Sequence, residues 1–266
     1  MARSASTLLL LAASFGPLAA AHGAQGGHHE PKYQHQLQEI LAAVPSSSDS
    51  HPVAAIKPPP DPLPATTRAH WMRYAISLVP VLSTPATPCP FQAFVSVVVN
   101  HTLSFEDPAY LGDLVCSAIN GVPLTGNPTQ HGEVAAIDAC SAVLAEEPYS
   151  LPTPDGVLGA FRNLSLYTTA EPCAMCAGAI LWAGFRDAVF GTNNSALTKM
   201  KWPTIMMSSQ ELVGRAWALG TNTTFYGSVL ANETDPLFDW QFQGVNGTCP
   251  AGCVKEAPDG PCAAAA

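Results

Sequence analysis

Two cysteines three residues apart, Cys173 and Cys176, stand at the start of an expected helix. At this spacing both thiolates can bind one metal ion. His131 lies just before another expected helix and would supply a third ligand, leaving one coordination position open as in catalytic zinc sites. Glu133 can lie beside a water in that position without ligating the metal, and can act as its base. The pattern therefore predicts Zn2+ held by His131, Cys173 and Cys176, with Glu133 as the catalytic residue.

The cysteine pair has two other interpretations. Residues 172–176, Pro-Cys-Ala-Met-Cys, also fit a redox dithiol, or half of a structural zinc site that Cys249 and Cys253 would complete. A redox dithiol leaves His131 and Glu133 without a role, and a structural site does not need Glu133. The combination of both motifs, each between a strand and a helix, favours the catalytic interpretation.

Strand-like and helix-like segments alternate after Phe91, which indicates a layered α/β fold. A helix that starts at Thr66 or Thr67 and ends before Pro80 precedes them. The expected strands are 91–99, 114–118, 164–168, 188–190 and 224–229, and the expected helices are 132–145, 174–183 and 210–218. Residues 148–159 and 191–207 are expected to be loops. The helix between the last two strands allows a crossover, and so a parallel pair.

The two motifs together resemble a known family. His-X-Glu followed by Pro-Cys-X-X-Cys is similar to the signature of the zinc-dependent cytidine and deoxycytidylate deaminase-like superfamily. Residues 127–134 and 166–180 resemble most closely the branch of tRNA adenosine deaminases, guanine deaminases and fungal cytosine deaminase. Residues 71–75 and 189–191 resemble the first helix and fourth strand of that branch. Over about residues 66–230, the resemblance implies a three-layer α/β/α cytidine deaminase-like fold with a five-stranded mixed sheet, often dimeric.

The resemblance also implies roles for single residues. By motif match, His131, Cys173 and Cys176 are the zinc ligands and Glu133 is the proton shuttle. Family members place a substrate-binding asparagine after the second strand, a place that Asn120 fits. Asn120-Gly121 is also a favoured turn dipeptide, so a purely structural role is the alternative.

Two residues depart from the family pattern: Gly132 replaces the commoner alanine, and Asn127 stands where aspartate is usual. Other residues near the motifs are weaker candidates for substrate contact. Asn193 and Asn194 follow the fourth strand, but Asn193 begins a glycosylation sequon and neither is predicted to bind substrate. Three tryptophans offer faces on which a base can stack: Trp182, Trp202 and Trp240.

The N-terminus predicts a secreted protein. Residues 1–21 have a positive start, a short apolar run and a small-residue cleavage site, as in a signal peptide. No later stretch is long enough to span a membrane. Six sequons agree with a secreted glycoprotein; their asparagines are Asn100, Asn163, Asn193, Asn222, Asn232 and Asn246. In an oxidising compartment the six remaining cysteines can form three disulfides: Cys89, Cys116, Cys140, Cys249, Cys253 and Cys262. Cys249, Cys253 and Cys262 are expected to hold the C-terminal tail, with Cys89 as one partner, whereas Cys116 and Cys140 could equally be free thiols.

Four segments are expected. They are a signal peptide at 1–21, an extension with a short helix and a Pro-rich linker at 22–65, a zinc deaminase domain at 66–243 and a cysteine-containing tail at 244–266.

The leading hypothesis is a secreted hydrolase that deaminates a free nucleobase or nucleoside, such as guanine, cytosine, cytidine or an adenosine-like molecule. The formal net charge of −9 disfavours a nucleic-acid partner, because phosphate backbones require basic surfaces. The alternatives are an RNA (tRNA adenosine) deaminase and a secreted, non-catalytic protein that zinc stabilises. A homodimer is the assembly to test.

Overall fold

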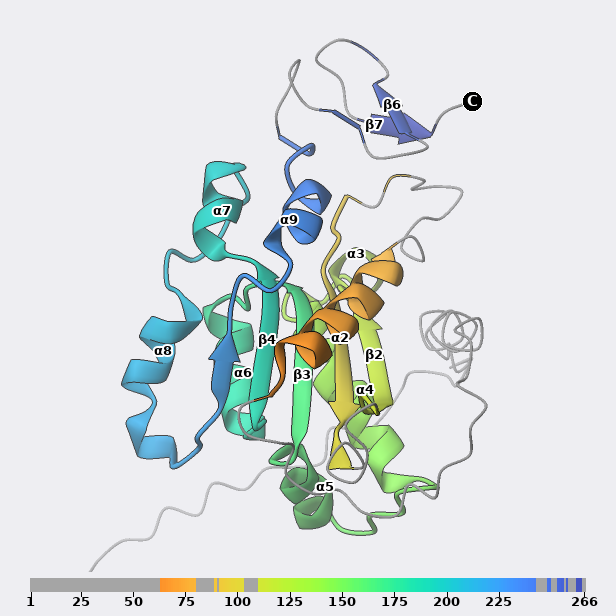
Figure 1. Ribbon diagram of the computed structural model, residues 1–266, viewed down its shortest axis with the longest axis vertical. Coiled ribbons are helices and arrows are strands. Elements are labelled where there is room, and N and C mark those ends of the chain that lie inside the picture. The colour runs from red at the N-terminus through yellow and green to blue at the C-terminus, as the bar shows by residue number, and fades with distance from the viewer. Residues whose placement is uncertain are drawn as a thin grey trace, which may run out of the picture.

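The computed structural model describes residues 63–79, 89, 91–102, 110–242, 248–249, 253–255, 257 and 262–264. The expected signal peptide, the helix at 33–44, nearly all of the linker and Asn246 lie outside these residues. The described chain is built around one five-stranded sheet, which is flanked by helices on both faces (Figure 1).

The sheet is mixed, with strand order β2-β1-β3-β4-β5. Its strands are β1 (Val95–Asn100), β2 (Asp113–Ile119), β3 (Leu164–Ala170), β4 (Asp187–Thr192) and β5 (Thr224–Tyr226). β1 runs antiparallel to β2 and β3, whereas β3, β4 and β5 are parallel. Every residue of β1, β3 and β4 is buried, as expected for strands covered on both faces. The α/β class, the five-stranded mixed sheet and the parallel pair at its end are confirmed.

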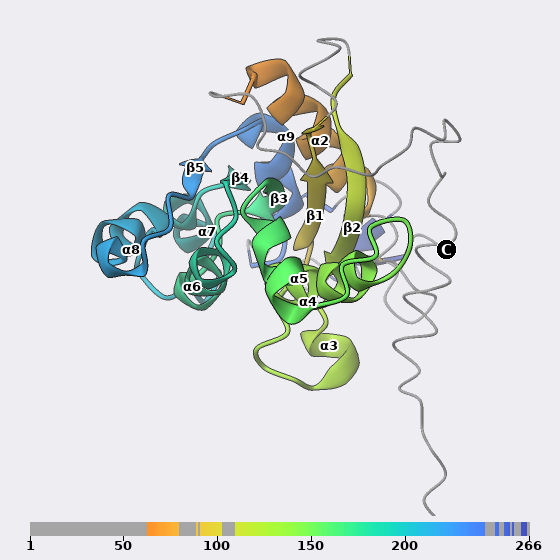
Figure 2. The ribbon, with the colours of Figure 1, turned by 90° about the horizontal axis from the view of Figure 1, so that it is seen from below.

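Helices cover the two faces of the sheet and make a three-layer arrangement. α2 (Ala65–Ser77) and the short α9 (Ala231–Thr234) lie on one side, and α4 (Gly132–Ala145), α5 (Pro154–Phe161) and α6 (Ala174–Ala183) lie on the other (Figure 2). Trp71 and Met72 of α2 pack against Val97 and Val99 of β1. On the opposite face, Leu144 of α4 and Ile180 of α6 belong to one core with β3 and β4. The starts of α4 and α6 therefore carry His131, Glu133 and both cysteines of the predicted metal site.

Several expected boundaries were wrong, mostly at prolines. α2 begins after Pro64, which is its N-cap, and neither Thr66 nor Thr67 caps it. The expected loop 148–159 contains the start of α5, because Thr153 Oγ1 accepts a hydrogen bond from Gly156 N and Pro154 fits the first helical turn. The expected loop 191–207 contains α7 (Asn194–Lys199). α3 (Val122–Thr125) was not expected.

The remaining elements follow β4 or lie in the tail. The helix expected at 210–218 is α8 (Ser209–Arg215), followed by the 3₁₀ turn η3 (Trp217–Leu219). A capping box between Ser208 and Glu211 starts α8. A second 3₁₀ turn, η4 (Asp235–Leu237), follows α9. β6 (Cys253–Lys255) and β7 (Cys262–Ala264) form a separate antiparallel pair.

Three disulfides pair all the cysteines outside the predicted metal set. Cys116 of β2 is bonded to Cys140 of α4, which settles the alternative of free thiols at these positions. Cys89 is bonded to Cys253, and Cys249 to Cys262. The expected attachment of the tail through Cys89 is confirmed, and Cys249 and Cys253 do not form half of a zinc ribbon.

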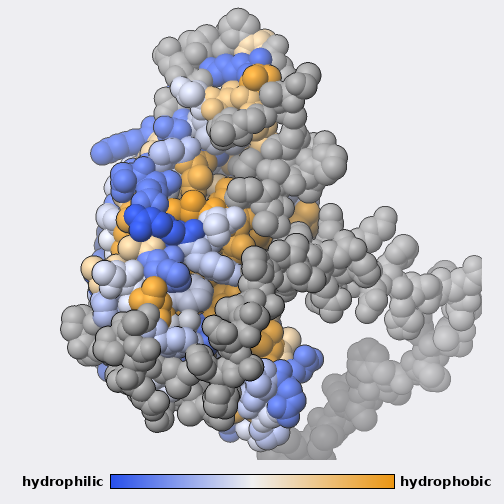
Figure 3. All heavy atoms as spheres, turned by 45° about the vertical axis from the view of Figure 1, so that its right-hand side comes forward, coloured by the Kyte–Doolittle hydropathy of each residue, from blue (hydrophilic) through white to orange (hydrophobic). Residues whose placement is uncertain are grey.

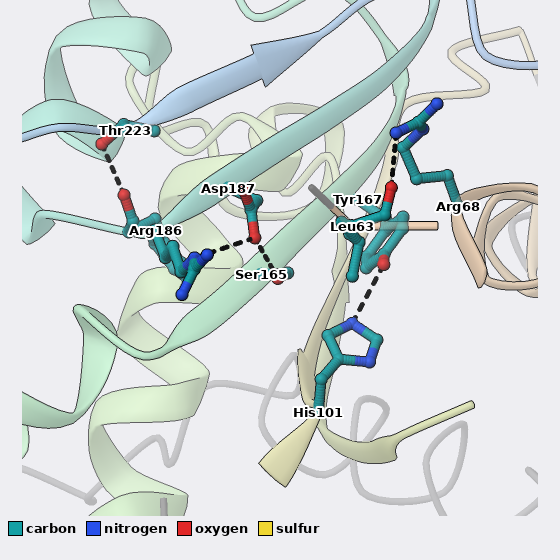
Figure 4. A network of polar contacts seen from close by, with 9 residues as sticks. Leu63, Arg68, His101, Ser165, Tyr167, Arg186, Asp187 and Thr223 are labelled. Atoms are coloured by element: carbon teal, nitrogen blue, oxygen red, sulfur yellow. Dashed lines mark hydrogen bonds and ion pairs between the residues drawn. The ribbon is translucent and has the colours of Figure 1, made fainter. Parts of the chain in front are cut away.

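Buried polar pairs also link the strands. His101 Nε2 lies 3.0 Å from Tyr167 Oη, and Ser165 Oγ donates to Asp187 Oδ2 at 3.1 Å (Figure 4). Both ring-bearing side chains of the first pair are fully buried. Burial lowers the pKa of His101 to about 4, so the ring is neutral in the folded protein.

The surface mixes hydrophobic and hydrophilic residues on the face shown in Figure 3. Among the described residues, the most exposed large hydrophobic side chains are Trp217, Met206 and Trp182, at 85%, 76% and 73%. None of the described helices combines the length and the apolar character needed to cross a membrane.

Candidate metal centre and substrate pocket

Two helix N-termini bring the predicted zinc ligands together. His131 is the N-cap of α4 and Cys173 is the N-cap of α6, both in extended conformation, and Cys176 lies in the first turn of α6. Cys173 Sγ is 3.7 Å from His131 Nδ1, and the ligand atoms of all three residues lie within 4.8 Å of one another. Two sulfurs and one imidazole nitrogen form a donor set that zinc prefers. The arrangement fits a zinc ion with three protein ligands.

The ionisation of the two thiols agrees with such a site. A hydrogen bond from Cys176 is the main cause that lowers the pKa of Cys173 to about 4, with a further contribution from His131. The same hydrogen bond, together with burial, raises the pKa of Cys176 far above its usual range. The pair thus holds one negative charge and one proton. A bound divalent cation would remove that proton, because thiols that coordinate a metal are deprotonated.

Glu133 lies directly beside this set. It is in the first turn of α4, only 6% of its surface is exposed, and its carboxyl group is hydrogen-bonded with Cys176. Burial is the main cause that raises the pKa of Glu133. The structure therefore places a buried carboxyl group next to the predicted metal ligands.

A cavity of about 450 Å³ is lined by Glu133 and by two of the three predicted ligands, His131 and Cys173. Its walls come from the start of β1, the end of β2, the turns before α4 and α6, and the segment after β4. The lining residues are Gln92, Phe94, Asn120, Val122, Pro128, His131, Glu133, Glu171, Cys173, Met175, Asn194, Leu197, Trp202, Pro203, Thr204 and Ile205. A larger apolar hollow of about 760 Å³ lies over α4, α5 and α6, but none of the predicted ligands lines it.

Asn120 lines the cavity directly after β2. Its Oδ1 accepts a hydrogen bond from Val122 N at 3.1 Å, and its Nδ2 donates to Gln92 Oε1. Asn120 therefore both stabilises the turn after β2 and lines the cavity. Asn127, by contrast, is exposed, and its side chain accepts hydrogen bonds only locally, from Thr129.

Glu171 was not singled out from the sequence. Its carboxylate accepts hydrogen bonds from Asn194 N, Ser209 N and Ser209 Oγ, each at 2.8 Å. These contacts fix the N-termini of α7 and α8. The segment between them contains the lining residues from Asn194 to Ile205, and we call residues 194–205 the pocket wall. Glu171 therefore holds the pocket wall beside Cys173.

The structure also separates the weaker candidates. Asn194 is buried and lines the cavity, whereas Asn193 donates through Nδ2 to Ser228 Oγ. Of the three tryptophans, only Trp202 lines the cavity. The position of Asn194 directly after β4 could have indicated from the sequence that it lines the cavity. Gln92 and the other residues of the pocket wall have no local sequence pattern that marks them.

Residues 110–192 match the family model described as the cytidine and deoxycytidylate deaminase zinc-binding region. Over these residues the chain is similar to that family. The matched region includes both motifs, which confirms the resemblance to this family.

The chain is similar to curated deaminases that are named for different substrates. The chain is 32% identical over 109 residues to a probable cytosine deaminase of Schizosaccharomyces pombe, covering 39% of this chain and 58% of that protein. It is 39% identical over 75 residues to a guanine deaminase of Bacillus subtilis, covering 27% of this chain and 38% of that protein. It is 38% identical over 85 residues to a tRNA-specific adenosine deaminase 2 of Xenopus laevis, covering 32% of this chain and 45% of that protein. The chain thus spans about half the length of the curated relatives it matches.

A solved structure, the guanine deaminase of Nitrosomonas europaea, is 20% identical with a TM-score of 0.46, covering 71% of this chain and 96% of that one. A similarity of this size does not bear on the substrate.

Proposed function

We propose that this protein is a zinc-dependent hydrolase that deaminates a free nucleobase or nucleoside and releases ammonia. The observation that supports this most is the position of Glu133. A buried carboxyl group that lies beside two cysteines and a histidine and lines a cavity of about 450 Å³ has no use in a structural zinc site. The cavity is within the size range of small-molecule sites.

In this proposal His131, Cys173 and Cys176 would hold zinc. The bound ion would act as a Lewis acid and lower the pKa of a water molecule. Glu133 takes a proton from the attacking water and passes it to the ring nitrogen of the substrate. The water oxygen bonds to the ring carbon that carries the amino group. Glu133 then takes the second proton of that oxygen and passes it to the amino group, the C–N bond breaks as the ring carbonyl forms, and ammonia leaves. Burial strengthens the carboxylate of Glu133 as a base, because it disfavours the charged form.

The chain's other residues would bind and orient the substrate. Asn120 would hydrogen-bond the base, and Phe94 and Trp202 would give it an apolar wall. The rings of Phe94 and Trp202 already pack edge to face, with centroids 5.2 Å apart. The two rings thus form one apolar surface at the cavity.

We also propose that the enzyme acts outside the cell as a glycoprotein. The expected signal peptide and the three disulfides support an oxidising compartment. Among the sequon asparagines that the structure describes, Asn222 and Asn232 are exposed and suited to carry a glycan, whereas Asn100 is buried. The homodimer stays a prediction, which sedimentation equilibrium of the secreted protein would test.

One assay tests the proposed activity. The purified, zinc-loaded protein is incubated with cytosine, guanine, cytidine, adenosine and RNA, and ammonia is measured. We expect ammonia from at least one base or nucleoside. Ammonia from RNA alone would instead support an RNA deaminase, and ammonia from none of them, with loss of folding on chelation, would support a zinc-stabilised protein without catalysis.

A further inference from the structure

We propose that Gln92 determines specificity by donating hydrogen bonds, together with Asn120, to a ring carbonyl oxygen of the substrate. This inference rests on the proposed deaminase function and narrows its substrate to bases such as cytosine and guanine, in preference to adenine. Gln92 precedes β1 and lies outside both motifs and outside the residues that match the family model.

The hydrogen bonds around Asn120 fix the orientation of both amides. Val122 N can only donate, so the atom of Asn120 that accepts from it is Oδ1. Asn120 Nδ2 must then face Gln92, and the atom of Gln92 that accepts from it is Oε1. Gln92 Nε2 therefore has two hydrogens to donate, and none of the described residues accepts them. Asn120 Nδ2 keeps one further hydrogen.

Three other polar side chains that line the cavity already have hydrogen-bond partners. The carboxylate of Glu171 holds α7 and α8, as described above. Asn194 Nδ2 donates to Met207 O at 3.3 Å. The indole N–H of Trp202 donates to Phe238 O at 2.8 Å. Among the side-chain amides and the indole that line the cavity, Gln92 is thus the one with an uncommitted N–H₂ group.

The number of donors favours a particular acceptor. Gln92 and Asn120 are hydrogen-bonded to each other, so their remaining N–H groups are neighbours at one side of the cavity. A carbonyl oxygen has two lone pairs and can accept from both donors. A ring nitrogen has one lone pair and satisfies only one of them. Cytosine and guanine carry a ring carbonyl, whereas adenine offers ring nitrogens alone.

Two substitutions separate this role from mere support of Asn120. In Gln92→Glu, one carboxylate oxygen still accepts from Asn120 Nδ2, but the other replaces the donor N–H₂ with an acceptor. Gln92→Met removes both interactions. Asn127→Asp serves as the control, because it makes a similar amide and carboxylate exchange at an exposed site outside the cavity. The kinetics of ammonia release from cytosine, guanine and adenine are measured for each variant, with zinc content and circular dichroism as checks of the fold.

We expect the wild type and Asn127→Asp to prefer cytosine or guanine to adenine. Gln92→Glu is expected to lower kcat/KM for the preferred base at least about tenfold, mainly through KM, as for a lost hydrogen bond in a closed site. Wild-type kinetics in Gln92→Glu would overturn the proposal, even if kcat/KM falls in Gln92→Met. A preference of the wild-type protein for adenine would also overturn it.

A wild type that releases no ammonia at all would show that the proposed function itself fails. Calorimetric titration with cytosine and guanine then decides the role of Gln92. Weaker binding to Gln92→Glu than to the wild type would support the role, and equal binding or none would overturn it.

Discussion

Replacement of Glu171 should loosen the pocket wall and destabilise the fold. Its carboxylate is buried and accepts three hydrogen bonds, each at 2.8 Å, from Asn194 and Ser209. Hydrogen bonds to a charged group are each worth roughly 1.5 kcal/mol at the low end, so the loss of three in Glu171→Ala should lower the free energy of unfolding by about 4.5 kcal/mol. Glu171→Gln keeps one acceptor oxygen and should lose about half as much.

Urea unfolding of the zinc-loaded protein measures this loss, with Glu211→Gln as the control. Glu211 caps the same helix, α8, but it is exposed, so its replacement should change stability little. Glu171→Gln should also raise KM more than it lowers kcat, because the pocket wall moves while Glu133 and the metal ligands stay in place. A loss below about 1 kcal/mol in Glu171→Ala, with KM unchanged, would refute this reasoning.

Three further predictions concern pH, the disulfide and the metal. Because the pKa of His101 is about 4 in the fold and 6.5 ordinarily, stability should be full above pH 6.5 and fall by about 3 kcal/mol as the pH drops to 4; denaturant titrations across this range should show a flatter profile for His101→Gln. Removal of the buried disulfide in the double variant Cys116→Ala/Cys140→Ala should cost about 3 kcal/mol of stability, measured by urea unfolding, given a sequence separation of 24 residues. Cys176→Ser should lose bound zinc in metal analysis while Cys116–Cys140 stays oxidised, and full retention of zinc would contradict the ligand set.

The sequence predicted the elements whose patterns are local. β1, β3, β4, α4 and α6 follow continuous or periodic apolar runs, and α4 matched the expected residues 132–145. The boundaries failed where proline was interpreted only as a break. Pro64 and Pro154 instead stand at helix starts, where the missing N–H costs nothing and the ring fixes a helical φ.

The residues of the candidate site also differ in how well the sequence predicts them. His131, Glu133, Cys173 and Cys176 were predicted because their spacing within each motif is short and chemically specific. The substrate cavity is instead assembled from distant segments: Gln92 meets Asn120 across 28 residues, and Glu171 meets Ser209 across 38. No local pattern marks such pairs, because the first contact depends on how β1 and β2 lie side by side and the second on how α8 packs beside the end of β3.

The central claim is that Glu133 moves the proton in a zinc-dependent deamination. Ammonia release from the preferred base should be measured for the zinc-loaded wild type and for Glu133→Gln, with zinc content determined on the same samples. General-base catalysis contributes about 10²–10⁴-fold, so Glu133→Gln should lose at least about 100-fold in kcat while it retains the wild-type amount of zinc. Wild-type turnover in Glu133→Gln with zinc bound would contradict the claim.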